Sequence, residues 1–471
     1  MTWHVRVIAN RYADSVRLMG VAGDVRALDG VERCELAMGT PANLEALAAL
    51  GAEAKASPGD VVIAVQVGDE HAAAEALDAA ERGLQADEGA PHAAGAGETP
   101  PRSLSAAARR LNGANVALVS VPGAYAALVA HQALSRGLHV FLFSDHVDVA
   151  DEVALKRRGV QRDRLVMGPE CGTAMLGGVG LGFANVVRRG PVGIVAAAGT
   201  GAQEAACLLD AAGVGVSHIV GVGGRDLSRE IGGVMFRAGM QLLAGDDETD
   251  ALLLVSKPPD REVVRGLAGE LPADKRVVAA FVGGDGAAAP FEVHPTLEAG
   301  VCALAGAPPP RVAELEQAVD RARGRSAGRA VLGLFSGGTL AQEAASILGP
   351  GHRVLDLGAE EYTRGRPHPM VDLGTRVRML DDAAGDDAIG CVLLDVVLGH
   401  GAHPDPASEL AEPIARLAGS KTVIARVCGT RADPQDADRQ TAAIRDAGAL
   451  VAPSNAAAAR LAARAVAGSA V

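Results

Sequence analysis

The chain has 471 residues, a length that predicts about three or four domains. Aromatic residues make up only 2% of the chain against 49% hydrophobic residues, so the core is aliphatic and stacked-ring platforms for single-stranded nucleic acid are excluded. The formal net charge of −13, without a long basic run, argues against any partner that presents a phosphate backbone. The composition therefore predicts a globular protein that binds no nucleic acid.

The spacing of the cysteines and the length of the apolar runs indicate the cell compartment in which the protein is expected. The six cysteines form no CxxC pair and no disulfide-framework spacing, so reduced thiols in a cytosol are the simplest interpretation. The segment Met1–Val7 lacks the pattern of a signal peptide, and no unbroken apolar stretch reaches the roughly 18 residues of a membrane span. We expect a cytoplasmic protein with no membrane contact and no metal site.

Residues 1–85 alternate short apolar strands with helices. Strands are predicted at 5–9, 31–37 and 61–67, and helices at 14–29, 42–50 and 70–84. This alternation indicates a small α/β module. Residues 86–104 are rich in Ala, Gly and Pro and are expected to form a linker.

Residues 105–190 have a different character, because their apolar runs are continuous. Strands are predicted at 115–121, 139–143 and 164–167, with helices at 124–136 and 149–158 between them. Continuous runs are typical of parallel strands that are buried on both faces. The segment is therefore expected to be a Rossmann-type βαβαβ domain.

Two more α/β domains are predicted at 191–305 and 329–471, separated by a Pro- and Ala-rich linker at 306–328. The first has predicted strands at 192–197, 216–221, 251–255 and 276–282, and helices at 202–213, 229–245 and 260–269. The second has predicted strands at 330–335, 353–357, 390–396, 422–427 and 449–452, and ends in an Ala-rich helix at 454–468.

These two domains contain an internal repeat. Residues 193–206 read GIVAAAGTGAQEAA and residues 332–345 read LGLFSGGTLAQEAA, so AQEAA recurs after an apolar strand and a Gly-Thr turn in both copies. The shared placement favours a duplicated domain over a chance match in an Ala-rich chain. Duplicated halves often face each other across a site.

The two turns of the repeat are candidate anion sites. Gly199, Thr200 and Gly201 begin one predicted helix, and Gly337, Gly338 and Thr339 begin the other. The first amides of a helix are unpaired and carry partial positive charge, so two converging helix starts would hold one phosphate. A plain strand-to-helix turn is the alternative interpretation of each Gly-Thr.

Two segments at predicted strand ends carry further candidate side chains. Gly223, Gly224, Arg225 and Asp226 follow a strand and favour anion or carboxylate binding. The two glycines are substrate-binding candidates and Arg225 and Asp226 are catalytic candidates, with a surface Arg–Asp pair as the alternative. In Gly168-Pro-Glu-Cys-Gly-Thr173, Thr173 is a candidate ligand contact, and Cys171 is expected to be an inert small residue rather than a nucleophile.

The Pro-held loop at 364–372 offers Arg366 and His368 as catalytic candidates, in spacings that match no common metal site. Asp395 and Gly399 end a predicted strand, which is where ligands bind in open α/β sheets. An exposed polar turn is the alternative for His400 and His403, which follow Gly399.

Segments along nearly the whole chain resemble the FdrA family, whose members look like a fused succinyl-CoA synthetase. The matching segments are GTPAN at 39–43, GPECGTA at 168–174, GFANVVRRG at 182–190, GVGGRDLSREIGG at 221–233, VSKPP at 255–259, SGGTLAQEA at 336–344, GRPHPMVD at 365–372 and LLDVVLGHGAHPDPA at 393–407. The resemblance implies a CoA-binding-like Rossmann domain followed by two flavodoxin-like, ligase-type parallel-sheet domains, after a small N-terminal α/β module. It adds Asn185 to the substrate-binding candidates.

The same resemblance implies a subunit of an oxamate carbamoyltransferase, which interconverts oxalurate plus phosphate with oxamate plus carbamoyl phosphate in allantoin breakdown. Partner subunits are implied, and a homo-oligomer stays open. An acyl-CoA ligase that resembles succinyl-CoA synthetase, with CoA as a ligand, is the alternative, and a non-catalytic scaffold is the second. The G-H-A-G-A segment that carries the phosphate-relaying histidine of the synthetases is missing here, where the chain reads GGDGAAAPFEVHPTLEAG, and no ATP-grasp domain is seen.

Overall fold

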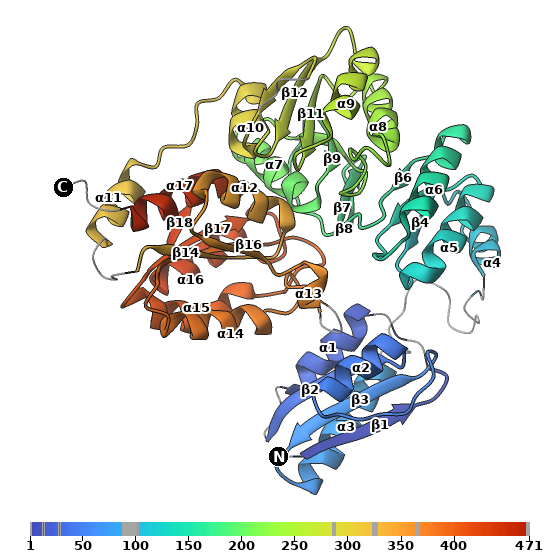
Figure 1. Cartoon of the computed structure of the whole chain (residues 1–471). Coiled ribbons are helices and arrows are strands. Elements are labelled where there is room, and N and C mark those ends of the chain that lie inside the picture. Colours follow the sequence, from blue (N-terminus) through green and yellow to red (C-terminus); the bar gives the residue numbers. More distant parts are fainter. Residues whose placement is uncertain are drawn as a thin grey trace. The chain divides into compact units, whose positions relative to one another are not determined.

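The computed structural model covers the whole chain (Figure 1) and describes residues 2–467 except 12, 14, 27, 29, 87–100, 102, 285–288, 323–327 and 364–366. The chain divides into two compact units. One comprises residues 1–100 with 358–372, and the other comprises residues 101–357 with 373–471. Most of the expected 86–104 linker lies outside the described residues.

The first unit is a three-stranded sheet covered by helices on both faces. Its strands β1 (Thr2–Ile8), β2 (Val31–Met38) and β3 (Val61–Val67) are antiparallel in the order β1-β3-β2. Successive residues of the central strand β3 point to opposite faces of the sheet and pack into two separate small cores. This strand is therefore buried on both faces. The helices of this unit are α1 (Ser15–Arg26), α2 (Pro41–Ala49), α3 (Glu70–Ala86) and α13 (Glu360–Thr363).

The second unit begins with a small parallel sheet, which we call the three-stranded domain (residues 103–167). Its strands are β4 (Val116–Val119), β5 (His139–Leu142) and β6 (Val166–Met167), in that order. Its helices are α4 (Leu104–Arg110), α5 (Gly123–Ser135) and α6 (Val149–Gln161).

The seven-stranded domain (residues 173–305) follows, with its strands in the order β13-β12-β11-β9-β10-β7-β8. Strands β9 to β13 are parallel, whereas β7 and β8 form a hairpin that pairs antiparallel with β10. The strands are β7 (Thr173–Leu176), β8 (Val179–Gly182), β9 (Arg189–Ala197), β10 (Val216–Gly221), β11 (Ala251–Ser256), β12 (Arg276–Phe281) and β13 (Glu292–His294). The helices are α7 (Gly199–Ala211), α8 (Val234–Ala244), α9 (Arg261–Arg265), the 3₁₀ turn η1 (Gly266–Glu270) and α10 (Leu297–Ala305).

The five-stranded domain (residues 328–357 and 373–467) has a fully parallel sheet in the order β15-β14-β16-β17-β18. The strands are β14 (Ala330–Phe335), β15 (Arg353–Asp356), β16 (Ile389–Val397), β17 (Thr422–Cys428) and β18 (Leu450–Ala452). The helices are α12 (Gly338–Leu348), α14 (Gly374–Ala384), α15 (Pro406–Ala418), α16 (Ala437–Asp446) and α17 (Asn455–Val466). All nine residues of β16 are buried, as expected for a strand at the centre of the sheet.

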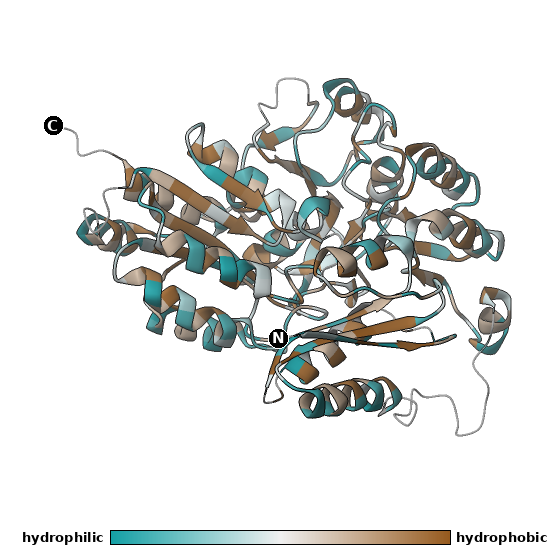
Figure 2. Cartoon of the chain, turned by 60° about the horizontal axis from the view of Figure 1, so that its bottom comes forward, coloured by the Kyte–Doolittle hydropathy of each residue, from teal (hydrophilic) through white to brown (hydrophobic). Residues whose placement is uncertain are grey.

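The predicted fold class is confirmed, because α/β domains with parallel sheets follow a small N-terminal module. Hydrophobic residues concentrate in the strands and hydrophilic residues on the outer helix faces (Figure 2). The large core around β9 and β11 is built mainly of Ala, Val, Leu and Ile, as the composition predicts.

Two segments differ from the sequence-based expectation. The β7–β8 hairpin falls inside the predicted 105–190 domain but pairs with the sheet of the next one. The predicted 306–328 linker contains α11 (Ala313–Ala322), which buries Val319 and Ala322 and pairs its Asp320 with Arg464 of α17. In both cases a short amphipathic segment is ordered by contacts that are distant in sequence, which local pattern does not show.

Candidate functional site

The two Gly-Thr turns of the repeat begin helices that no side chain caps. Helix α7 begins at Gly199 after Ala198, and α12 begins at Gly338 after Gly337. Both preceding residues have extended backbones, and neither makes a side-chain hydrogen bond to the helix start. The first amides of the two helices are therefore available to an anion.

The structure brings the two turns into direct contact. A Cβ placed on Gly337 would overlap the side chain of Thr200, and one placed on Gly201 would lie 2.8 Å from Thr339 Cγ2. Thr200 is 8% exposed and Thr339 is 2% exposed. All six residues predicted to bind phosphate are therefore gathered at one junction, which we call the helix junction. It comprises Gly199, Thr200, Gly201, Gly337, Gly338 and Thr339.

A buried hydroxyl without a partner lies at the α7 side of the helix junction. Thr173 is 2% exposed, and its Oγ1 makes no hydrogen bond. This oxygen lies 3.7 Å from the position that a Cβ of Gly199 would occupy. An unsatisfied buried hydroxyl costs about 1–3 kcal/mol, and an oxygen ligand at the start of α7 would remove that cost.

Two charged residues that the sequence analysis did not select lie at the α12 side. A Cβ on Gly338 would lie 2.7 Å from Lys257 Nζ and would overlap the Asp356 carboxylate. Lys257 directly follows β11, and Asp356 ends β15. The signal that could have found Lys257 is its place at the carboxyl end of a parallel strand, where ligands bind in α/β sheets.

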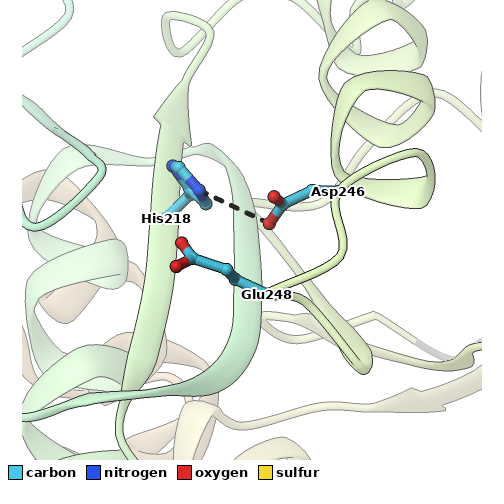
Figure 3. Close-up of side chains that lie close together, drawn as sticks. All are labelled: His218, Asp246 and Glu248. Carbon is cyan, nitrogen blue, oxygen red and sulfur yellow. Dashed lines mark ion pairs between the residues drawn. The ribbon is translucent and has the colours of Figure 1, made fainter.

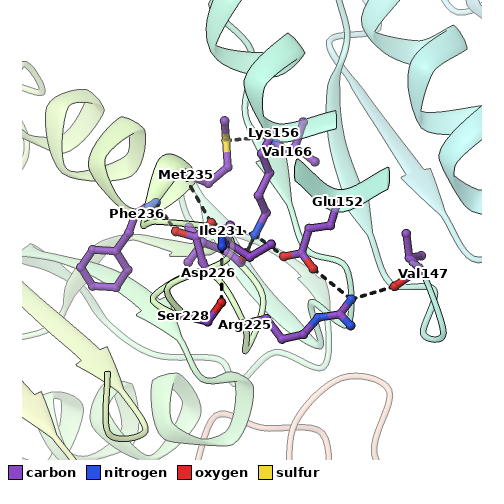
Figure 4. Close-up of polar contacts among 11 residues, drawn as sticks. Val147, Glu152, Lys156, Val166, Arg225, Asp226, Ser228, Ile231, Met235 and Phe236 are labelled. Carbon is purple, nitrogen blue, oxygen red and sulfur yellow. Dashed lines mark hydrogen bonds and ion pairs between the residues drawn. The ribbon is translucent and has the colours of Figure 1, made fainter. Parts of the chain in front are cut away.

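Asp226, a predicted catalytic residue, is fully buried in a polar network between α6 and the loop before α8 (Figure 4). Lys156 Nζ lies 2.7 Å from both the Asp226 and the Glu152 carboxylates. The backbone amide of Phe236, in the first turn of α8, also donates to Asp226. Asp226 thus joins the three-stranded and seven-stranded domains and caps a helix.

Arg225 belongs to the same network. Its guanidinium lies 2.9 Å from Glu152 Oε2 and donates to the carbonyl of Val147 (Figure 4). The alternative of a surface Arg225–Asp226 pair is wrong, because the two residues pair with α6 and not with each other: Arg225 with Glu152 and the fully buried Asp226 with Lys156. Gly223 has a φ of +86° and approaches Pro169 closely, whereas Gly224 has open space at its Cβ position.

Asn185 and Gly399, both predicted to bind substrate, lie where the loop after β8 meets the five-stranded domain. Asn185 donates to the Leu398 carbonyl and to the Asp433 carboxylate, both at 2.9 Å. Gly399 has a φ of +111°, and a Cβ there would lie 2.5 Å from the Ala184 carbonyl oxygen. The structure therefore uses these residues to hold the two domains together.

Asp395 lies directly behind the start of α12. It is fully buried, accepts hydrogen bonds from the amide and hydroxyl of Ser336, and pairs with the buried Arg376 at 2.8 Å. Ser336 precedes Gly337 in the α12 turn. Asp395 is thus placed to hold the shape of this turn.

The remaining catalytic candidates belong to the first unit. Arg366 lies outside the described residues. His368 Nδ1 accepts a hydrogen bond of 3.2 Å from the amide of Met370. In the other unit, burial raises the pKa of the Cys171 thiol to about 12, which disfavours the thiolate that a nucleophile needs.

A group of possible metal ligands comprises His218, Asp246 and Glu248 (Figure 3). The amide of Gly177 donates to His218 Nδ1, so a neutral imidazole carries its proton on Nε2, the atom that faces Asp246 at 3.4 Å. A metal would need that nitrogen unprotonated. The group is therefore better described as a histidine–carboxylate pair on the surface.

Comparison with known proteins identifies a relative that is similar to nearly the whole chain and two family models that match parts of it. It is 33% identical to the protein described as uncharacterized protein YahF of Escherichia coli K12, over 97% of both chains. The chain belongs to the YahF family. The family model described as CoA-ligase matches residues 334–465 of the present chain. The family model described as the heavy metal-associated domain of AllF matches residues 1–100.

Part of the chain is also similar to succinate–CoA ligases. It is 30% identical to the α subunit of the ADP-forming enzyme of Aquifex aeolicus, over 31% of this chain and 48% of that one. Among solved structures, PH0766 of Pyrococcus horikoshii aligns over 79% of this chain and 87% of its own, with 16% identity and a TM-score of 0.32. ATP citrate lyase of Methanothrix soehngenii, solved with citrate and coenzyme A, aligns over 44% of this chain and 38% of its own, with 18% identity and a TM-score of 0.35. The match to the CoA-ligase model thus establishes a ligase-type domain at residues 334–465.

The name of the N-terminal family model implies a heavy metal, which the residues present do not fit. Cys34 is the only cysteine in residues 1–100. It is 1% exposed, and burial raises the pKa of its thiol to about 12. A thiol held neutral and away from solvent is a poor metal ligand.

Among the described residues, no helix is long and apolar enough to cross a membrane.

Proposed function

We propose that the protein binds the phosphate of an acyl phosphate at the helix junction and uses it in acyl transfer of the CoA-ligase type. The observation that carries this proposal is the direct contact between the Thr200 turn and Gly337, which joins two uncapped helix starts. The match of residues 334–465 to the CoA-ligase family and the similarity to succinate–CoA ligases support it.

The electrostatics of the helix junction favour an anion. Each helix N-terminus carries a charge of about +0.5, so two such ends in contact repel one another. A bound anion turns this repulsion into attraction, at about 0.3–1 kcal/mol for each helix. Glycines at both turns allow the anion to approach the backbone.

In the proposed reaction an acceptor attacks the acyl carbon and the acyl–phosphate bond breaks. The phosphate leaves with the bonding electron pair, and the helix amides stabilise the charge that develops on its oxygens. For a CoA thiolate as the acceptor, the products are a thioester and inorganic phosphate. Cys171 takes no part, because its thiol is held neutral.

Carbamoyl transfer is the second candidate, and the match of residues 1–100 to the AllF domain favours it. In this FdrA-type reaction oxamate accepts the carbamoyl group of carbamoyl phosphate, and the same junction receives the phosphate. Arg225, which lies in the same compact unit as the junction, would then neutralise the oxamate carboxylate. We further propose that the chain acts in the cytoplasm with partner subunits of the carbamoyltransferase.

Phosphorus NMR of the full chain separates these candidates. Release of phosphate from succinyl phosphate only when CoA is present would support the ligase type. Release from carbamoyl phosphate only when oxamate and the partner proteins are present would support carbamoyl transfer. If the chain binds neither phosphate, carbamoyl phosphate nor CoA, it is a non-catalytic scaffold and the proposal fails.

A further inference from the structure

Lys257 differs from most other lysines of the chain in having no hydrogen-bond or ion-pair partner among the described residues. The chain has only five lysines, at positions 55, 156, 257, 275 and 421. Three of them have a structural use: Lys156 pairs with two carboxylates, and Lys275 and Lys421 each donate to two backbone carbonyls. Lys257 is exposed and makes no hydrogen bond or ion pair with any residue that the structure describes.

Its ammonium nevertheless occupies a defined place beside the first residue of α12. Lys257 Nζ lies 2.7 Å from the point where a Cβ of Gly338 would stand. Any other residue at position 338 would fill the space that this ammonium occupies. The glycine therefore permits the close approach of a cation to the helix start.

A cation at this end of a helix is electrostatically unfavourable, since the helix N-terminus is itself positive. The Asp356 carboxylate, which lies against the same Cβ position, offsets part of this cost. A bound anion would contact the ammonium and the helix amides together. The placement of Lys257 is thus explained by a ligand that is negatively charged.

A second observation at the helix junction points to a ligand independently. The hydroxyl of Thr173, 2% exposed and without a partner, is directed at the start of α7. The contact between Thr200 and Gly337 joins that start to α12. A hydroxyl donor therefore serves one side of the junction, and an ammonium donor serves the other.

We propose that Lys257 is a ligand of the bound phosphate and supplies its countercharge at the α12 side. This inference rests on the proposed function and adds the charge requirement of the site: the ligand is a phosphate-bearing anion. A neutral acyl compound would leave the ammonium at the positive end of the helix with only the Asp356 carboxylate to offset it.

Titration of the full chain with inorganic phosphate, followed by calorimetry, tests the assignment. Lys257→Gln should weaken phosphate binding about tenfold or more, because an ammonium–phosphate hydrogen bond is charge-assisted. Lys257→Arg should keep binding within a few-fold of the natural chain. The matched control is Lys55→Gln, which removes the same charge from an exposed site in residues 1–100 and should leave binding unchanged.

The possible failures are distinguishable. If the natural chain binds phosphate and Lys257→Gln binds it equally well, the assignment of Lys257 is overturned while the helix junction stands. If the natural chain binds no phosphate, the proposed function fails first and the assignment falls with it.

A second measurement needs no variant. Acetylation of the full chain by an amine reagent is followed at Lys257 and Lys55 by mass spectrometry, with and without phosphate. Phosphate should slow the acetylation of Lys257 several-fold and leave Lys55 unaffected. Equal rates at Lys257 under saturating phosphate would overturn the assignment.

Discussion

Glu204 and Glu343 occupy the same place in the two AQEAA copies, and each accepts a hydrogen bond from the first residue of a helix in the other domain. The amide of Asn455, which begins α17, donates to Glu204 at 3.0 Å, and the amide of Leu297, which begins α10, donates to Glu343 at 2.7 Å. This reciprocal pattern is what a duplicated domain packed against its own copy would produce. It also fixes α7 and α12 against each other and so sets the helix junction.

The two glutamates differ in their countercharge. Glu204 is paired with Arg426 at 2.9 Å, whereas Glu343 has only amide donors, from Leu297 and Asn455. Burial, with the nearby Glu204 and Glu298 carboxylates adding to it, raises the pKa of Glu343 from its ordinary 4.5 to about 7. The folded state therefore holds a proton at Glu343 that the unfolded state has lost.

This raised pKa makes stability fall with pH. Between pH 4.5 and 7 the unfolded chain binds fewer protons at Glu343 than the folded chain, so the free energy of unfolding decreases as the pH rises. Glu343→Gln should flatten this dependence, which amounts to about 3 kcal/mol at most. Denaturant titrations at pH 5 and pH 8 measure it. Equal pH dependence in the variant and the natural chain would show that Glu343 is not its source.

Glu204→Gln should act differently, because it leaves the guanidinium of Arg426 buried without its carboxylate. Loss of one partner from a buried ion pair costs about 3–5 kcal/mol. We expect a lower unfolding midpoint across the whole range from pH 5 to 8, with the pH dependence retained. A midpoint unchanged from the natural chain would mean that the Glu204–Arg426 pair does not hold the two domains together.

Gly337→Ala tests the close contact of the two turns. The new methyl group would overlap the Thr200 side chain, so we expect a loss of about 1–3 kcal/mol in stability and weaker phosphate binding. Gly419→Ala is the matched control, since that glycine ends α15 at an ordinary φ of −70° with open space around it. Phosphate affinity in Gly337→Ala equal to that of the control would argue against an anion at this contact.

Thr173→Val removes a hydroxyl and keeps the shape of the side chain. Because Oγ1 has no protein partner, the substitution should not lower the stability of the phosphate-free protein and should raise it by about 1 kcal/mol. Phosphate binding should weaken several-fold. Calorimetry and thermal unfolding measure the two effects. Lower stability with unchanged phosphate affinity would contradict a ligand-directed hydroxyl.

The sequence was sufficient for the parallel strands and for the meeting of the repeated turns. Strands such as β10 and β14 lie where their apolar runs predict them, because burial on both faces leaves an unbroken pattern. The AQEAA repeat predicts α7 and α12 as equivalent helices of a duplicated domain. The apolar runs and the repeat are both patterns of neighbouring residues, so they can be recognised in the sequence without knowledge of the fold.

The roles of single polar residues could not be predicted in the same way. Asp226 and Asn185 stand in glycine-rich loops after strands, as ligand-binding residues do, yet their partners are Lys156 and Asp433, far away in the sequence. Lys257 is the opposite example: the sequence analysis did not select it, and the packing of the domains places it beside Gly338. A loop residue is bound by the protein or by a ligand according to what the fold brings opposite it.

The central claim is that the helix junction binds phosphate, and one comparison tests it most directly. Inorganic phosphate is titrated into the natural chain and into the double variant Thr200→Val with Thr339→Val, which keeps the packing of the two turns and removes both hydroxyls. We predict saturable binding of one phosphate to the natural chain and no measurable binding to the double variant. Equal binding by both proteins would contradict the two-helix site.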